Sequence, residues 1–189
     1  FLDTKKINAD DDIRLKTLSL GVVIPDKMME LAKEDKDMYQ FFPHNVYEEY
    51  GVTFDEVAID MGNWYDKLVE NPNIKKKLVN PRKILEVMAA LQGESGYPYV
   101  MFSDNVNSVR THPIKTKFSN LCSEILQVNV ISSYGDYGTN SDDIGFDISC
   151  NLASGNIVNM MEHKTIEETV VNAMVIMNSV SEKTNIAHR

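Results

Sequence analysis

The sequence has very few cysteines, no long apolar run and no visible targeting segment. Only Cys122 and Cys150 occur among its 189 residues, too few for a disulfide framework at this length, so we expect a reducing, cytoplasmic setting. No stretch approaches the roughly 18 consecutive apolar residues of a membrane span. The first six residues lack an initiator methionine and the basic and apolar regions of a signal peptide, so we expect a piece excised from a longer protein.

Positive charge is also scarce. Nineteen lysines and arginines stand against 28 aspartates and glutamates, and the formal net charge is −9. Proteins that bind nucleic acid or anionic membranes non-specifically carry the opposite sign, so we expect neither partner. Local groups can still hold a small phosphorylated ligand. The composition is otherwise that of an ordinary globular protein, with 43% hydrophobic and 25% charged residues.

Standard catalytic and metal-binding motifs are absent as well. The sequence has no glycine-rich phosphate loop, no Cys-x-x-Cys pair and no Gly-x-Ser-x-Gly elbow. Its four histidines are scattered, and none lies at metal-ligand spacing from a cysteine. We therefore predict no metal site on this chain.

Periodic apolar segments are what the sequence does contain. The clearest pattern predicts a helix over residues 82–92, ended by Gly93 and Gly96. Other patterns predict helices over 27–34 and 165–180, and weak helical character over 45–69 with breaks near Gly51 and Gly62. Strands are predicted over 17–24, 38–42, 97–102 and 120–130, and a further strand begins the segment 147–157. Helices alternating with strands predict an α/β fold with a substantially parallel sheet, in a single segment spanning residues 1–189.

One dense polar cluster lies within residues 119–125. If this segment is extended, Asn120, Cys122 and Glu124 project to one side, about 6.5–7 Å apart per two residues. Leu121 and Ile125 then project to the other side and anchor in a core. The amide can donate and accept hydrogen bonds and the carboxylate can act as a general base, so the set can hold a hydroxylated substrate.

The two thiols leave alternatives open. A lone cysteine in a buried strand is usually inert packing, and Cys122 fits that description too. A carboxylate at Glu124 would raise the thiol pKa, which opposes a thiolate nucleophile but suits chemistry that begins from a neutral S–H. Cys150 alone reads as a strand cysteine. A disulfide between Cys122 and Cys150 is a further alternative whose geometry the sequence does not test.

Five collinear segments carry a family resemblance. The sequence resembles the large catalytic subunit of class I ribonucleotide reductase, in particular the class Ib form. The matching segments are FLDTKKINAD (1–10), KTLSLGVVIPD (16–26), ESGYPY (94–99), SNLCSEILQV (119–128) and DISCNL (147–152).

The resemblance implies a fold and residue roles. The family fold is a ten-stranded α/β barrel with residues 120–124 on a loop inside it, and the reaction reduces ribonucleoside diphosphates to deoxyribonucleotides by radical chemistry. Cys122 matches the cysteine that becomes a thiyl radical and takes the 3′ hydrogen, and Glu124 matches the carboxylate that takes the 3′-hydroxyl proton. Asn120 matches the amide that binds the ribose hydroxyls, with Ser119 and Leu121 as further substrate-binding positions. Cys150 matches one of two reducing cysteines that end as a disulfide.

The resemblance also implies partners. These are a small radical-generating (beta) subunit with a dinuclear metal site, a thioredoxin- or glutaredoxin-like reductant, nucleoside triphosphate effectors and a second copy of the large subunit. The partner of Cys150 is expected before Phe1 and the radical-relay tyrosines after Arg189, so we expect the chain alone to be inactive. Some apolar faces, for example at Met174 and Met177, should then be exposed. The alternatives are a non-catalytic scaffold or interaction module with buried cysteines, and a related radical enzyme acting on another substrate.

Overall fold

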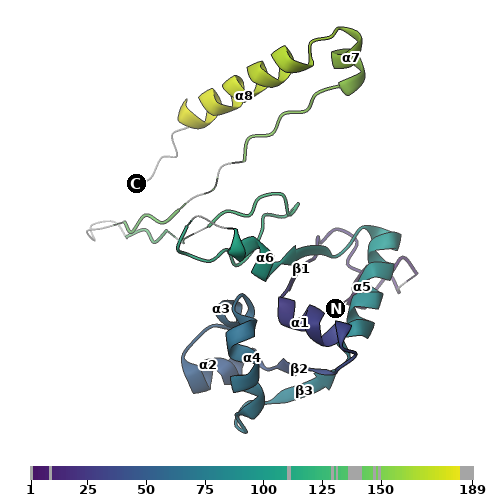
Figure 1. Ribbon diagram of the computed structural model, residues 1–189, viewed down its shortest axis with the longest axis vertical. Helices are drawn as coiled ribbons and strands as arrows, with labels where there is room; N and C mark the ends of the chain where they lie inside the picture. Colours follow the sequence, from purple (N-terminus) through teal and green to yellow (C-terminus); the bar gives the residue numbers. More distant parts are fainter. Residues whose placement is uncertain are drawn as a thin grey trace. The chain divides into compact units, whose positions relative to one another are not determined.

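The computed structural model describes residues 2–8, 10–109, 112–128, 130, 132–135, 142–146, 148 and 150–183 (Figure 1). Its contacts divide the chain into two units, Phe1–Val128 and Asn129–Arg189. The described residues are mixed α/β and contain no closed barrel.

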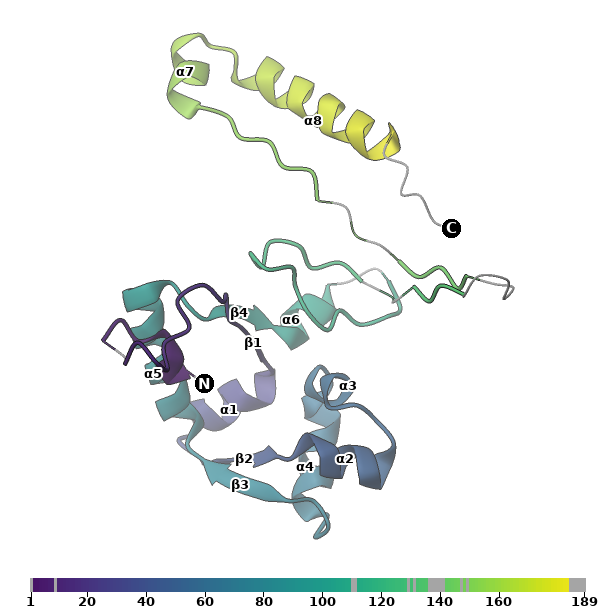
Figure 2. The same cartoon turned by 180° about the vertical axis from the view of Figure 1, so that it is seen from behind.

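A β-α-β arrangement forms the centre of the first unit. Its strands lie side by side and parallel, with Gly21 opposite Tyr99 (Figures 1 and 2). Parallel strands need a long crossover connection, and here two helices contribute to it. After a 3-10 turn, Leu2–Lys5, the elements are β1 (Gly21–Ile24), α1 (Asp26–Lys33), α5 (Pro81–Ser95) and β4 (Tyr99–Phe102).

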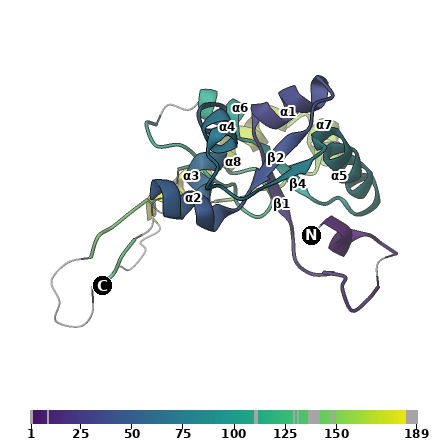
Figure 3. The same ribbon diagram turned by 90° about the horizontal axis from the view of Figure 1, so that it is seen from below.

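The two faces of the β1–β4 pair differ. Figure 3 shows helices α1 and α5 beside the two strands. On one face Ile24 packs with Met28 of α1 and Met88 of α5, and Val22 and Val100 lie against this cluster. Because side chains alternate along a strand, the residues between them face the other side. That second face borders the cavity described below.

A small lobe is inserted between α1 and α5. Its two strands pair antiparallel, with Met38 opposite Val79. Its core consists of buried apolar residues that include Val46, Val57 and Leu68, all 0% exposed. The elements of the lobe are β2 (Met38–Phe41), α2 (Pro43–Tyr50), α3 (Phe54–Ala58), α4 (Met61–Glu70) and β3 (Lys76–Val79).

The remaining elements are short or isolated. The first unit continues after β4 with α6 (Ser103–Ser108) and a stretch without regular structure. The described residues of the second unit form two isolated bridges, Val130 with Phe146 and Ser133 with Asp143, followed by α7 (Ile157–Glu162) and α8 (Ile166–Lys183). None of its described residues is buried. Among the described helices, none is both long and apolar enough to cross a bilayer.

Most predicted elements are confirmed with shifted ends. The helices at 27–34, 82–92 and 165–180 correspond to α1, α5 and α8, and the strands at 17–24, 38–42 and 97–102 to β1, β2 and β4. The region 45–69 contains three helices, with breaks at Gly51 and at Asp60, close to the predicted break near Gly62.

Other expectations are wrong. Helix α5 continues through Gly93, and Gly96 ends it because its φ of 75° favours a residue without a side chain. The predicted strand over 120–130 is a loop up to residue 128. Within 147–157 the described residues form no strand, while residues 147 and 149 lie outside the description. In the part of the chain that the structure describes, the strands form one parallel pair and one separate antiparallel pair, rather than a mainly parallel sheet.

Candidate functional site

The polar segment predicted as a strand turns back on itself. We call residues 117–125 the Cys122 loop. The backbone N–H of Ser123 donates to the carbonyl of Asn120 at 3.2 Å, and Ser123 has a φ of 67°. The N–H of Asn120 in turn donates to the carbonyl of Ile125 at 3.3 Å. Side chains therefore do not alternate here, and Leu121 is 68% exposed instead of anchored in a core.

The Asn120 side chain organises this turn. Its Oδ1 accepts a hydrogen bond from the backbone N–H of Ile125 at 3.0 Å, and its Nδ2 donates to Oε1 of Glu124 at 2.7 Å. A side-chain amide has both groups, so it can close a turn and hold a carboxylate at once. The predicted amide–carboxylate pair is thus formed by direct contact within a turn.

Cys122 lies in the same turn with an exposed, free thiol. Beside it, the Ser119 hydroxyl donates to the carbonyl of Asn120 at 3.0 Å and lies 3.4 Å from the Ser123 hydroxyl. Cys150 is also exposed and free, so the structure contains no disulfide between these two cysteines. Cys150 belongs to the second unit, and its place relative to the Cys122 loop stays a prediction.

A cavity of about 650 Å³ separates the Cys122 loop from the β1–β4 pair. This volume is in the range of small-molecule sites. A Cβ added at Gly21 would have no other atom within 4 Å, so open space borders the strand at this position. The lining consists of Ser19, Gly21, Val22, Val23, Tyr99 and Met101 from the strand side, and Phe118, Ser119, Asn120, Leu121 and Ser123 from the loop.

Tyr99 joins the cavity to the polar turn. The pKa of its hydroxyl is raised, first by the neighbouring Tyr97 phenol and its hydrogen bond, then by burial and by electrostatic interaction with Cys122 and Glu124. The Tyr97 and Tyr99 rings lie 5.1 Å apart between centroids, and the Tyr97 hydroxyl is 3.0 Å from that of Ser19. The site therefore presents a neutral phenol to any anionic group in the loop.

The sequence analysis missed this strand-side half of the cavity. Strand alternation within 17–24 and 97–102 was the available signal, because it places Val23, Tyr99 and Met101 together on one face of the strand pair. Among the described residues, no three His, Cys, Asp or Glu side chains gather as metal ligands would.

Comparisons with known proteins agree on one family. The family model described as "Ribonucleotide reductase, barrel domain" matches residues 1–188. The ribonucleoside-diphosphate reductase subunit alpha of Bacillus subtilis is 60% identical over 98% of this chain, and the subunit of that name from Mycoplasma pneumoniae is 43% identical over 98%. A second Bacillus subtilis protein, the ribonucleoside-diphosphate reductase NrdEB subunit alpha, is 61% identical over 65% of the chain and 11% of its own length. The chain spans 26% of each of the first two relatives.

Proposed function

Because this chain belongs to the ribonucleotide reductase barrel-domain family, we propose that it carries the thiyl-radical segment of a ribonucleoside-diphosphate reductase. One observation supports this most directly. Asn120 and Glu124 are hydrogen-bonded to each other within a turn that also bears the exposed Cys122 thiol, next to a cavity large enough for a small ligand. The activity belongs to the full-length catalytic subunit.

Each group in the turn has a role that its chemistry fits. The Cys122 sulfur, once oxidised to a thiyl radical, takes the 3′ hydrogen atom of the ribose, so that an S–H bond forms and a C–H bond breaks. Glu124 accepts the proton of the 3′ hydroxyl, since an exposed carboxylate is a competent base. Asn120 binds the ribose hydroxyls through its amide and at the same time orients the carboxylate through the 2.7 Å bond. Ser119 and Leu121 border the substrate.

The overall reduction needs two electrons. The 2′ hydroxyl leaves as water and a hydrogen takes its place, while Cys150 and a second cysteine outside this chain become a disulfide. Free, exposed thiols support this role, since a buried cysteine is inert packing. A reducing cytoplasm would keep them as thiols between turnovers.

Further components complete the proposed enzyme. A small beta subunit with a dinuclear metal site supplies the radical, and a thioredoxin- or glutaredoxin-like protein reduces the disulfide. Nucleoside triphosphates act as effectors on a dimer of large subunits. The names of the relatives support this scheme, because each is a subunit alpha of a ribonucleoside-diphosphate reductase.

The substitution Cys122→Ser in the full-length subunit tests the proposal. Serine has nearly the same size but its O–H bond is too strong to be a comparable hydrogen-atom donor, so we expect turnover to be lost while circular dichroism and thermal unfolding stay unchanged. Ser179→Ala, which removes a hydroxyl from the exposed face of α8, serves as a control that keeps turnover. Full turnover in Cys122→Ser would refute the radical role and favour the scaffold alternative. If Cys122→Ser loses turnover but the unsubstituted protein does not bind nucleoside diphosphates, the enzyme acts on a different substrate.

A further inference from the structure

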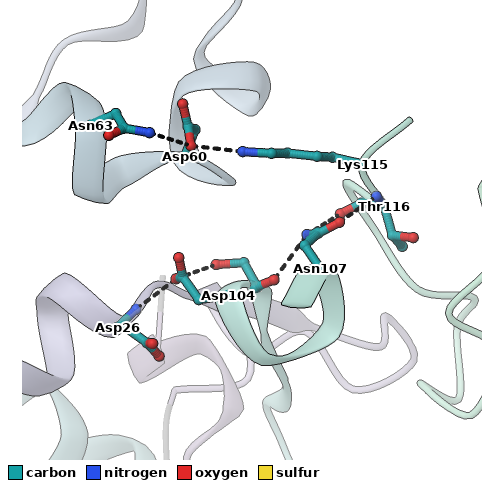
Figure 4. Close-up of polar contacts among 8 residues, drawn as sticks. Asp26, Asp60, Asn63, Asp104, Asn107, Lys115 and Thr116 are labelled. Atoms are coloured by element: carbon teal, nitrogen blue, oxygen red, sulfur yellow. Dashed lines mark hydrogen bonds and ion pairs between the residues drawn. The ribbon is translucent and has the colours of Figure 1, made fainter. Parts of the chain in front are cut away.

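A buried threonine lies at the base of the Cys122 loop. Thr116 is 3% exposed although its backbone belongs to no helix or strand. Buried backbone groups need hydrogen-bond partners, and here one side chain provides both. Oδ1 of Asn107 accepts a hydrogen bond from the backbone N–H of Thr116 at 2.8 Å, and Nδ2 of Asn107 donates to the backbone carbonyl of Thr116 at 3.1 Å (Figure 4). The side-chain amide of Asn107 thus makes the two backbone hydrogen bonds that a paired strand would otherwise make with Thr116.

Asn107 is itself tied to the parallel strand pair. Its Nδ2 also donates to the carbonyl of Ser103 at 2.9 Å within α6. Ser103 is fully buried, and its hydroxyl donates to the carbonyl of Ile24 at the end of β1 at 3.4 Å. The next residue, Asp104, accepts from the N–H of Asp26 at 2.8 Å at the start of α1 (Figure 4). A chain of polar contacts therefore runs from β1 and α1 through α6 to Thr116.

Thr116 also contacts the far end of the loop. Its hydroxyl donates to the carbonyl of Leu126 at 3.5 Å. Thr116 and Leu126 flank the Cys122 loop, so this contact joins the two points where the chain enters and leaves it. The residues enclosed between them include Asn120, Cys122 and Glu124.

Two lysines hold the chain on either side of Thr116. Nζ of Lys115 lies 2.7 Å from Oδ1 of Asp60, and Nζ of Lys117 lies 2.7 Å from Oδ2 of Asp55. Figure 4 shows Lys115 extending toward Asp60, to which Asn63 also donates at 3.0 Å. These carboxylates belong to the α3–α4 part of the lobe, so the base of the loop is connected to both the strand pair and the lobe.

We propose that Asn107 and Thr116, which we call the loop clamp, are positioning residues that hold the Cys122 loop over the cavity. The inference rests on the proposed function, because it assigns the clamp to the reaction that Cys122 and Glu124 carry out. Neither clamp residue lines the cavity, so they act through the loop rather than on the substrate. A displacement of about 1 Å in a reacting group can cost on the order of 100-fold in rate.

Substitutions in the full-length subunit with its radical-generating partner test the clamp. Thr116→Val keeps the shape of the side chain but removes the hydroxyl, and Thr116→Ser keeps the hydroxyl. We expect kcat to fall roughly 10-fold in Thr116→Val and roughly 100-fold in Asn107→Ala, with a much smaller change in KM, and near-normal kcat in Thr116→Ser. Hydrogen exchange at the Ser123 and Ile125 amides should accelerate in the first two variants and not in Thr116→Ser.

Asn71→Ala is the matched control. This amide also joins separate elements, donating to the Tyr50 hydroxyl at 3.0 Å, and its hydrogen-bond partners Glu49, Tyr50 and Asn73 lie outside the Cys122 loop. We expect it to lower thermal stability without changing kcat or loop exchange. Unchanged kcat in both Thr116→Val and Asn107→Ala would overturn the inference. A loss of kcat in Thr116→Ser as large as that in Thr116→Val would also overturn it, and so would equal losses of kcat in all variants, Asn71→Ala included, at matched stability.

The two proposals fail in different ways. If Cys122→Ser keeps full turnover, the proposed function is wrong. Loop exchange that stays the same in Thr116→Val and Asn107→Ala contradicts the clamp even when Cys122→Ser abolishes turnover. Faster loop exchange together with a lower kcat in the same two variants supports both.

Discussion

Helices α5 and α8 have similar sequence patterns and opposite surroundings. Apolar residues at helical spacing predict both helices. In α5 the apolar stripe is covered, with Met88 3% exposed and Leu91 2% exposed. In α8 no residue is buried, and Met174 and Ile176 are 51% and 62% exposed. A similar local pattern therefore coexists with two very different amounts of buried surface.

The difference separates helix formation from helix stability. Most helical stability in proteins comes from packing of the apolar face, and α5 has that packing against Ile24 and Met28. Its N-terminal end is also fixed, since Asn80 caps the first turn and Nη2 of Arg82 donates to the carbonyl of Ala32 at 2.7 Å. The exposure of Met174 is as expected, whereas Met177 is only partly exposed. An apolar face such as that of α8 is typical of a surface that packs against another part of a protein.

The largest expected contrast comes from truncating one apolar residue in each helix. Leu91→Ala removes a buried side chain of α5 and should lower the free energy of unfolding of the first unit by about 2–5 kcal/mol. Met174→Ala removes a half-exposed side chain of α8 and should change this free energy of unfolding by less than about 0.5 kcal/mol. Urea unfolding of the isolated chain measures both. Equal losses would mean that α8 is packed in solution.

A smaller contrast comes from two asparagines that cap helices in the same way. Oδ1 of Asn80 accepts from the N–H of Lys83 at 2.9 Å at the start of α5, and Oδ1 of Asn156 accepts from that of Asn159 at 3.2 Å at the start of α7. Asn80→Ala should cost about 1 kcal/mol in the main unfolding transition. Asn156→Ala should leave that transition unchanged because α7 buries no residue. Thermal denaturation of the two variants measures both losses of stability. A larger loss in Asn156→Ala than in Asn80→Ala would contradict the comparison.

Sequence reasoning succeeded where the signals are local. Pro81 and Gly96 mark the two ends of α5, and Pro25 follows β1, because these residues restrict or extend backbone freedom whatever surrounds them. It failed for β3, whose Lys76–Val79 pairs with residues far away along the chain and carries little apolar signal. The short helices α6 and α7, of six residues each, contain too few turns for a period to emerge.

The site shows a different kind of failure. Apolar residues at Leu121 and Ile125 suggested an extended segment, but the hydrogen bonds of the Asn120 side chain and the left-handed backbone of Ser123 form a turn instead. Polar side chains that bond to nearby backbone compete with strand pairing in this way. The expectation of a loop, which the resemblance implied, is confirmed. Its place inside a barrel and the roles of its residues stay predictions.

The smallest expected contrast is electrostatic. The hydrogen bond from Lys117 lowers the pKa of Asp55 from its ordinary value of 3.8, and the same bond raises the pKa of Lys117 from 10.5. A carboxyl group whose pKa is lower in the folded state stabilises the fold at pH values above its pKa in the unfolded chain. This stabilisation is lost as the pH falls through the pKa of the folded state. The stabilisation from the raised lysine pKa is lost at alkaline pH, as the pH rises through the lysine pKa of the folded state.

Lowering the pH from about 6 to about 3 should therefore weaken the first unit by more in the unsubstituted chain than in Asp55→Asn. The difference should stay below about 1 kcal/mol, because both side chains are about one third exposed, and it should shrink in salt. Glu167→Gln on α8 is the control, since it removes a carboxylate from the second unit and should leave this pH dependence unaltered. Urea unfolding at the two pH values measures all three proteins. The same slope for Asp55→Asn and the unsubstituted chain would mean that the Lys117–Asp55 pair does not anchor the base of the Cys122 loop in solution.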